Sequence, residues 1–226
     1  MSANETPSAV IIGAGGVLGH ALTRELAHQY HVIRTRRTPA ADDDAETALD
    51  LADRTSCDSF TDTLRGKHIA ALIFNAARSD DALIMRQSPA VFADAVDTYV
   101  LALHRIITAL TGELSGGSIV LIASLVGMRG GRGQAVYAAV KGALIGYAKG
   151  TAAALAAHDI RINAVLPGLF RSHINEGIDD AAFRSMIAEN ALKREQDVDE
   201  IARFVRFLSG MKNASGQVFN LDSRIT

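Results

Sequence analysis

Short apolar runs alternate with longer segments of helical periodicity along the whole chain, and this pattern constrains the fold more than any other feature. The runs stop at glycine or other small residues, as buried parallel strands do. We predict strands at residues 10–12, 31–35, 69–74, 118–123, 161–166 and 217–221. Helices are predicted at residues 18–29, 56–64, 88–110, 134–157, 179–190 and 198–208, with an acidic, poorly periodic stretch at 41–46. Such alternation predicts an α/β fold: a doubly wound parallel sheet of Rossmann type with helices on both faces.

Length and composition favour one domain over residues 1–226, since single cores remain workable up to about 250 residues. The net charge of −2 gives no electrostatic reason to expect nucleic acid or an anionic membrane as a partner. One cysteine, Cys57, cannot form an internal disulfide, which favours a reducing cytoplasm. The polar start lacks the pattern of a signal peptide, and no apolar run approaches the roughly 20 residues of a membrane span. We expect a cytoplasmic protein whose residues 1–8 form a disordered tail.

Glycines cluster between the first strand and the first helix, in Gly13-Ala14-Gly15-Gly16-Val17-Leu18-Gly19. Glycine at this point allows a tight turn and lets the backbone approach a pyrophosphate at the helix N-terminus. The strict dinucleotide fingerprint requires glycine where Leu18 stands, and here glycine instead recurs at every third position. A turn of this kind also occurs in strand-to-helix connections that bind nothing. Its place after the first strand of an alternating pattern favours a nucleotide site.

Tyr137 and Lys141 stand four residues apart in an alanine-rich helix, so both project from one face. An ammonium beside a phenol stabilises the phenolate and lowers its pKa, which suits a proton donor and acceptor. Ser124 follows the strand at 118–123, at the carboxyl edge where open parallel sheets bind their ligands. Its hydroxyl is placed to hold a substrate carbonyl oxygen. A tyrosine and a lysine at this spacing alone are also typical of an ordinary amphipathic helix.

Ser124, Tyr137-Ala138-Ala139-Val140-Lys141 and Pro167-Gly168 together resemble the short-chain dehydrogenase/reductase family, and the thirteen-residue interval from Ser124 to Tyr137 fits it. The resemblance extends over residues 9–222. It implies that Tyr137 is the general acid in reduction, that Lys141 binds the nicotinamide ribose and tunes Tyr137, and that Ser124 orients the carbonyl. Tyr137 and Lys141 therefore also count as cofactor-binding residues. The remaining cofactor-binding residues that it implies are Gly13, Gly15, Gly16, Leu18 and Gly19 at the pyrophosphate, Asp50 and Leu51 at the adenine, Asn75, Ala76 and Ala77 at the ribose, and Pro167, Gly168 and Ser172 at the nicotinamide.

The end of the second strand, Arg34-Thr35-Arg36-Arg37, predicts the cofactor. NAD enzymes typically place an acidic residue there to accept hydrogen bonds from the ribose hydroxyls. Guanidinium groups instead suit a 2′-phosphate, so Arg36 and Arg37 are predicted to bind NADP. The alternative is a solvated basic turn in an NAD enzyme, in which the nearest acids, Asp42 to Asp44, lie beyond Pro39.

The chain departs from the family's pattern at three places. The glycine spacing is similar to that of the extended branch, and Ala77 replaces a usual glycine. On the long helix after Asn75, Tyr99, with Thr98 beside it, stands where the family usually has an asparagine that supports a water-linked proton relay to the lysine. Tyr99, Thr98 or water would then fill that role, or the chain would be a slow or non-catalytic relative. Because Ser124, Tyr137 and Lys141 remain, we expect an active enzyme.

The resemblance implies an NADP-dependent oxidoreductase for a small-molecule ketone or secondary alcohol, with a β-ketoacyl thioester as the first substrate to consider. One alternative is an NAD-linked alcohol or diol dehydrogenase. The other is a non-catalytic dinucleotide-binding regulator, and the altered Asp222-Ser223 tail favours the regulator. Arg129 and Arg132, in the glycine-rich segment 127–133, belong either to a site for an anionic substrate or to a solvated surface loop. Histidine spacing gives no metal site. A homodimer or homotetramer is expected, packed through the helices around Leu101 and Leu144.

Overall fold

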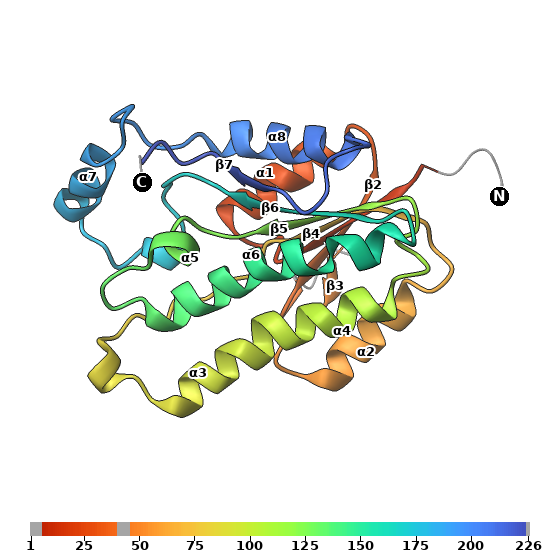
Figure 1. The fold of residues 1–226 in the computed structure, drawn as a ribbon, viewed down its shortest axis with the longest axis horizontal. Helices are drawn as coiled ribbons and strands as arrows, with labels where there is room; N and C mark the ends of the chain where they lie inside the picture. The colour runs from red at the N-terminus through yellow and green to blue at the C-terminus, as the bar shows by residue number, and fades with distance from the viewer. Residues whose placement is uncertain (1–5, 40–45, 225–226) are drawn as a thin grey trace.

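A parallel sheet of seven strands in the order β3-β2-β1-β4-β5-β6-β7 lies at the centre of the molecule (Figure 1). The computed structural model describes residues 6–39 and 46–224, and the statements below concern these residues. The strands are β1 (Ser8–Ile12), β2 (His31–Arg36), β3 (Glu46–Ala48), β4 (Ile69–Phe74), β5 (Ser118–Ile122), β6 (Arg161–Leu166) and β7 (Val218–Asn220). The chain order reverses beside β1, whose neighbours are β2 and β4, and this is the switch point at which such sheets bind ligands.

Helices cover both faces of the sheet (Figure 1). They are α1 (Val17–Leu26), α2 (Arg54–Thr63), α3 (Pro89–Val96), α4 (Ala102–Ala109), α5 (Val126–Arg129), α6 (Ala135–Ala156), α7 (Asp180–Ala188) and α8 (Val198–Gly210). Short helical turns occur at η1 (Ile84–Arg86), η2 (Asp97–Leu101) and η3 (His173–Asn175).

Two hydrophobic cores follow from the alternation of side chains along the strands. Val10 and Ile12 of β1 face the core that α2, α4 and α6 cover. Ala9 and Ile11 face the other core, which α1 and α8 cover. Because both faces of the central strands are buried, these strands are apolar throughout, which confirms the predicted doubly wound sheet.

Several predicted boundaries were wrong. The acidic stretch predicted at 41–46 ends where an unpredicted strand, β3, begins. β3 pairs in parallel with β2, with Glu46 opposite Arg34. Residues 41–45 of the stretch lie outside the described residues. The tail predicted at 1–8 is too long, because Ser8 already pairs with His31; residues 1–5 also lie outside the described part. The helix predicted at 88–110 is interrupted by η2, a π-helical turn between α3 and α4. Such turns are frequent at functional sites.

Neither a membrane span nor a metal cluster is present in residues 6–39 and 46–224. Their helices are all too short or too polar to cross a bilayer. The same residues contain no group of three or more histidine, cysteine, aspartate or glutamate side chains placed to hold a metal ion.

Candidate active site

A cleft of about 770 Å³ opens at the carboxyl ends of the central strands. Its walls come from the turn after β1, the end of β2, the segments after β4, β5 and β6, and the first turns of α6. In a parallel sheet these segments meet at one edge, next to the switch point beside β1. The fold thus brings together residues from both halves of the chain.

The turn after β1 requires glycine at two points. Gly13 has a φ of +86°, and a Cβ atom there would lie 2.8 Å from the backbone nitrogen of Ala76. A Cβ at Gly19 would lie 2.4 Å from the carbonyl oxygen of Ala14. Gly13 therefore packs the turn against the segment after β4, where Asn75 Nδ2 also donates to the Gly13 carbonyl at 2.8 Å. Gly19 packs α1 against the turn and does not line the cleft.

Gly16 leaves open space at the N-terminus of α1. A Cβ atom at this position would have no other atom within 4 Å, and Gly16 lines the cleft. It is the N-cap of α1, and no side chain caps the helix there. The first backbone N–H groups of α1 therefore face room that a phosphate could fill. This arrangement fits a dinucleotide pyrophosphate.

Arg36 and Arg37 line the cleft near the same turn. The Arg36 side chain covers Gly15, where a Cβ would lie 2.4 Å from Nε, and Nε lies 3.5 Å from the Glu46 carboxylate. The Glu46 side chain is almost fully buried, so part of the Arg36 charge is already neutralised. Arg37 is exposed. Of the two guanidinium groups, Arg37 is the one more open to an added anion.

Ser124 and Tyr137 meet on the floor of the cleft. The Ser124 hydroxyl accepts a hydrogen bond from the backbone nitrogen of Val126 at 3.2 Å, and Ser124 lines the cleft. Ser124 also interacts with the Tyr137 side chain in the sense that lowers the pKa of Tyr137 and favours the phenolate. Gly127 permits the close packing, because a Cβ there would lie 2.6 Å from the Lys141 backbone. The two hydroxyls are thus preorganised around one point.

Lys141 is almost fully buried behind Tyr137. Its Nζ donates to the Ile122 carbonyl at 2.7 Å and lies 5.8 Å from the centre of the Tyr137 ring. Burial without a carboxylate partner lowers the pKa of Lys141 from 10.5 to about 7. The lysine therefore changes charge near neutral pH.

The expected lowering of the Tyr137 pKa by Lys141 is not found. Burial raises the pKa of Tyr137, and the hydrogen bond from Ser124 is the interaction that opposes this rise. The physical reason is that Lys141 donates to the Ile122 carbonyl and is only partly charged near pH 7. In the protein without ligand, Ser124 rather than Lys141 favours the phenolate.

Thr98 and Tyr99 both line the cleft from η2. Thr98 is 8% exposed, and its hydroxyl oxygen has no hydrogen-bond partner in the described structure. Tyr99 packs against the core that α2, α4 and α6 cover and against a small cluster of Ala95, Val136 and Val140, and burial raises its pKa. Of the two residues considered for the position of the asparagine, Thr98 is the one with an unsatisfied buried hydroxyl.

The structure brings nearly all of the residues chosen from the sequence into this one cleft, with Gly19 as the exception. Those that line the cleft are Gly13, Gly15, Gly16, Leu18, Arg36, Arg37, Asp50, Leu51, Asn75, Ala76, Ala77, Ser124, Tyr137, Lys141, Pro167, Gly168 and Ser172.

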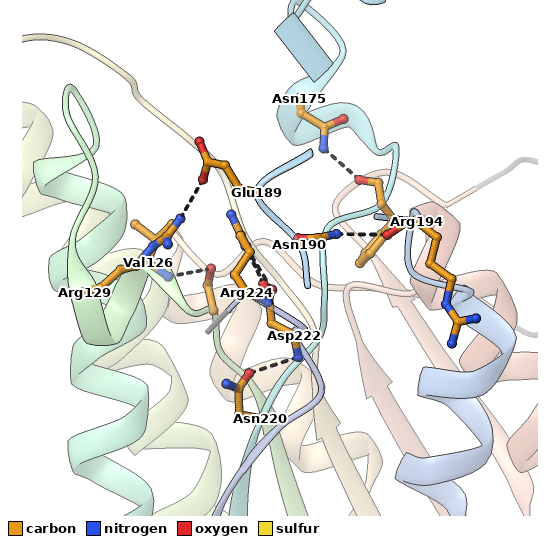
Figure 2. Close-up of polar contacts among 11 residues, drawn as sticks. Val126, Arg129, Asn175, Glu189, Asn190, Arg194, Asn220, Asp222 and Arg224 are labelled. Atoms are coloured by element: carbon orange, nitrogen blue, oxygen red, sulfur yellow. Dashed lines mark hydrogen bonds and ion pairs between the residues drawn. The ribbon is translucent and has the colours of Figure 1, made fainter. Parts of the chain in front are cut away.

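Glu189 and Arg224 are among the charged residues of the cleft to which sequence reasoning gave no role. Glu189 follows α7 and lies 3.6 Å from Arg129 of α5 (Figure 2). Arg224 follows β7 and pairs with Asp222. The departure at Asp222-Ser223 was the one signal in the sequence that pointed to this part of the site.

Comparison with known proteins gives a family match over residues 20–223, to the family described as Enoyl-(Acyl carrier protein) reductase. The 3-oxoacyl-[acyl-carrier-protein] reductase FabG of Chlamydia muridarum is 30% identical over 159 residues, which cover 68% of this chain and 64% of that protein. FabG of Staphylococcus epidermidis is 27% identical over 237 residues, which cover 95% of this chain and 97% of that protein. The match thus spans just under two thirds of the first of these relatives.

The fold is also that of a solved structure, a short chain dehydrogenase family protein from Francisella tularensis subsp. tularensis SCHU S4. Its TM-score is 0.88 at 22% identity, over 97% of this chain and 98% of that chain. The family match covers most of the sequence. The chain therefore belongs to the short-chain dehydrogenase/reductase family.

Proposed function

We propose that this protein is an NADP-dependent oxidoreductase that interconverts a ketone and a secondary alcohol, with a 3-oxoacyl thioester as the first substrate to test. The observation that carries the proposal is the contact of Ser124 with Tyr137, with Lys141 behind them, in the same cleft as the glycine turn. The substrate class follows the activity for which the FabG relatives are named.

The chain's own residues hold the reacting oxygen and move its proton. Ser124 and Tyr137 both line the cleft, and a carbonyl oxygen held between their hydroxyls would accept a hydrogen bond from each. In reduction, the Tyr137 O–H bond breaks and its proton goes to that oxygen. When bound in the cleft, a nicotinamide dinucleotide would supply or accept the hydride. The high pKa of Tyr137 keeps it protonated at neutral pH, which suits reduction.

Steady-state assays with NADPH and NADH test the proposal. The panel contains 3-oxoacyl thioesters, simple ketones, and secondary alcohols and diols with the oxidised cofactors. We expect consumption of NADPH with at least one carbonyl compound. Binding of the dinucleotide without turnover of any compound would instead indicate a regulator, and a preference for NAD with diols would indicate the alcohol dehydrogenase alternative.

Arg37→Ala is expected to weaken NADPH binding by about 10- to 100-fold, because a charge-assisted hydrogen bond to the 2′-phosphate contributes about 1.5–3 kcal/mol. NADH binding should change little, since NADH has no such phosphate. Fluorescence titration of both reduced cofactors measures the two affinities. Arg54→Ala removes the same charge outside the cleft, from an exposed arginine that pairs with Asp58 at 3.6 Å, and is the matched control. Equal losses for the two cofactors in Arg37→Ala would contradict NADP selection by this residue.

Thr98→Val is expected to lower turnover roughly tenfold, because it deletes a buried hydroxyl at the cleft that is free to hold a relay water. Tyr99→Phe should keep its turnover, since Tyr99 packs mainly as a core residue. Tyr99→Asn should lower the thermal midpoint through the cavity it leaves. Turnover and midpoints of the three variants are the measurements. Full activity in Thr98→Val with a slow Tyr99→Phe would assign the relay to Tyr99 instead.

We also propose a cytoplasmic homodimer or homotetramer. Leu101 is 37% exposed and can contribute to an interface, whereas Leu144 is fully buried within the protomer and cannot. The exposed face of α6 carries Gly146 and Gly150, where an added Cβ would meet no other atom within 4 Å. This face supports close packing of a second helix. Analytical ultracentrifugation of the purified protein tests the oligomeric state, and a monomer at all concentrations would refute it.

A further inference from the structure

The segment after β7 carries a buried arginine into the cleft. Arg224 is 8% exposed and lines the same cleft as Ser124 and Tyr137. Two backbone hydrogen bonds hold the segment in place: Leu221 N to the Leu166 carbonyl at 2.9 Å, and Ala191 N to the Ser223 carbonyl at 2.9 Å. The position of Arg224 is therefore set by β6 and by the segment after α7.

Only part of the Arg224 guanidinium is engaged. Its Nε lies 2.9 and 3.0 Å from the two carboxylate oxygens of Asp222, and its Nη2 also donates to Asp222 (Figure 2). No described residue accepts a hydrogen bond from its Nη1. A guanidinium has five N–H donors, so at least the two on Nη1 are available to a ligand in the cleft.

The charges at this end of the cleft favour an oxygen acceptor over a bare alkyl chain. The Asp222 side chain is completely buried and does not line the cleft, so the counter-charge of Arg224 lies behind it. Arg129 and Glu189, which line the same end, lie 3.6 Å apart and offset each other. An alkyl chain against Arg224 would leave its Nη1 donors desolvated and unpaired, which costs about 1–3 kcal/mol or more.

We infer that Arg224 determines substrate specificity by donating from Nη1 to a carboxyl-derived oxygen of an oxo acid or its ester or thioester, beyond the carbonyl that reacts. This inference deepens the proposed function and rests on it for the position of the reacting carbonyl. Because the Arg224–Asp222 pair is neutral overall, Arg224 can donate to the carbonyl oxygen of an ester without burying a net charge. Plain ketones lack the acceptor and lose this contact.

Three small ketones isolate the contact: methyl acetoacetate, free acetoacetate, and methyl butyl ketone, which replaces the ester group by methylenes. The measured quantity is the ratio of kcat/KM for methyl acetoacetate to that for methyl butyl ketone, with NADPH. Since the ester itself changes the reactivity of the ketone, the change in this ratio between variants is decisive. A charge-assisted hydrogen bond predicts a fall in the ratio of about 10- to 100-fold when Arg224 is replaced.

The variant replaces both members of the ion pair, Asp222→Asn with Arg224→Met, because Arg224→Met alone would leave the buried Asp222 carboxylate without its partner. Asp222→Asn keeps the side-chain oxygen that accepts the backbone N–H at position 224, a contact of 2.9 Å. Arg203→Met is the control, since this exposed arginine of α8 lies outside the cleft. Thermal midpoints show whether the double variant keeps its fold.

A loss for methyl acetoacetate that methyl butyl ketone does not share supports the inference. A still larger loss for acetoacetate identifies the carboxylate as the preferred source of the oxygen. An unchanged ratio, or equal losses for the ester and the ketone, would overturn it. Calorimetry of methyl acetoacetate with the protein loaded with oxidised NADP, which has no hydride to transfer, gives a readout without turnover. If binding depends on Arg224 but the protein reduces no ketone, the oxidoreductase proposal is wrong and the inference about Arg224 still holds. Binding that is absent, or equal in the double variant, would overturn the inference.

Discussion

Tyr137→Phe is expected to lower the turnover of ketone reduction by about 10²–10⁴-fold, the usual contribution of a general acid. The substitution deletes the one hydroxyl that contacts Ser124 on the floor of the cleft, and it keeps the ring. The affinity for NADPH should therefore stay nearly unchanged. Steady-state rates and fluorescence titration of NADPH measure the two effects separately.

Tyr147→Phe is the matched control for this prediction. Tyr147 lies on the same helix, and its hydroxyl is 3.0 Å from His104 Nδ1, away from the cleft. The same chemical change there should leave turnover intact. If Tyr137→Phe kept more than about a tenth of the wild-type rate, Tyr137 would not be the acid.

Lys141→Met is expected to abolish turnover, to weaken cofactor binding, and to raise the thermal midpoint of the cofactor-free protein at pH 7. Activity falls because the buried ammonium behind Tyr137 is lost. Stability rises because burial opposes the charged form of Lys141, whose pKa falls from 10.5 to about 7. Burying the charged lysine costs on the order of a few kcal/mol of folding free energy. The hydrogen bond to Ile122 returns only about 1 kcal/mol.

The sign of the pH dependence follows from this pKa. Between pH 7 and 10.5 the unfolded chain binds the lysine proton more strongly than the folded protein does. The contribution of Lys141 to stability therefore rises with pH in this window. The gain in midpoint for Lys141→Met should be largest at or below pH 7 and should shrink toward pH 10.5. Thermal unfolding across this range measures it.

Lys149→Met is the control for the stability effect, because Lys149 is an exposed lysine of the same helix. It should change the midpoint little at any pH. A midpoint of Lys141→Met below that of the wild type at pH 7 would show that packing and the bond to Ile122 outweigh the burial of the charge.

Much of the site was predictable because it depends on local order along the chain. Apolar runs such as 69–74 mark strands that are buried on both faces, and parallel strands bring the residues that follow them to one edge. Ser124 after β5 and the pair Tyr137 and Lys141 on α6 therefore had to lie near one another. Gly13 follows β1 for the same reason.

Other features were decided by tertiary contacts. β3 has only three residues, Glu46–Ala48, without an apolar pattern, and exists through its pairing with β2. The π-helical turn at η2 depends on a hydrogen-bond register that side-chain periodicity does not report. Gly19 has the spacing of a cofactor-binding glycine. In the structure its lack of a side chain allows close packing against Ala14.

The chemistry of the cleft shows the same division. The parallel sheet and the order of Ser124, Tyr137 and Lys141 could be predicted from local sequence, because hydrophobic periodicity and strand ends are local properties. Tertiary structure alone decided the low pKa of Lys141 and the place of Arg224 at the cleft. The physical reason is that desolvation and ion pairing depend on which distant segments bury a group. The residues next to that group in the sequence do not indicate which segments these are.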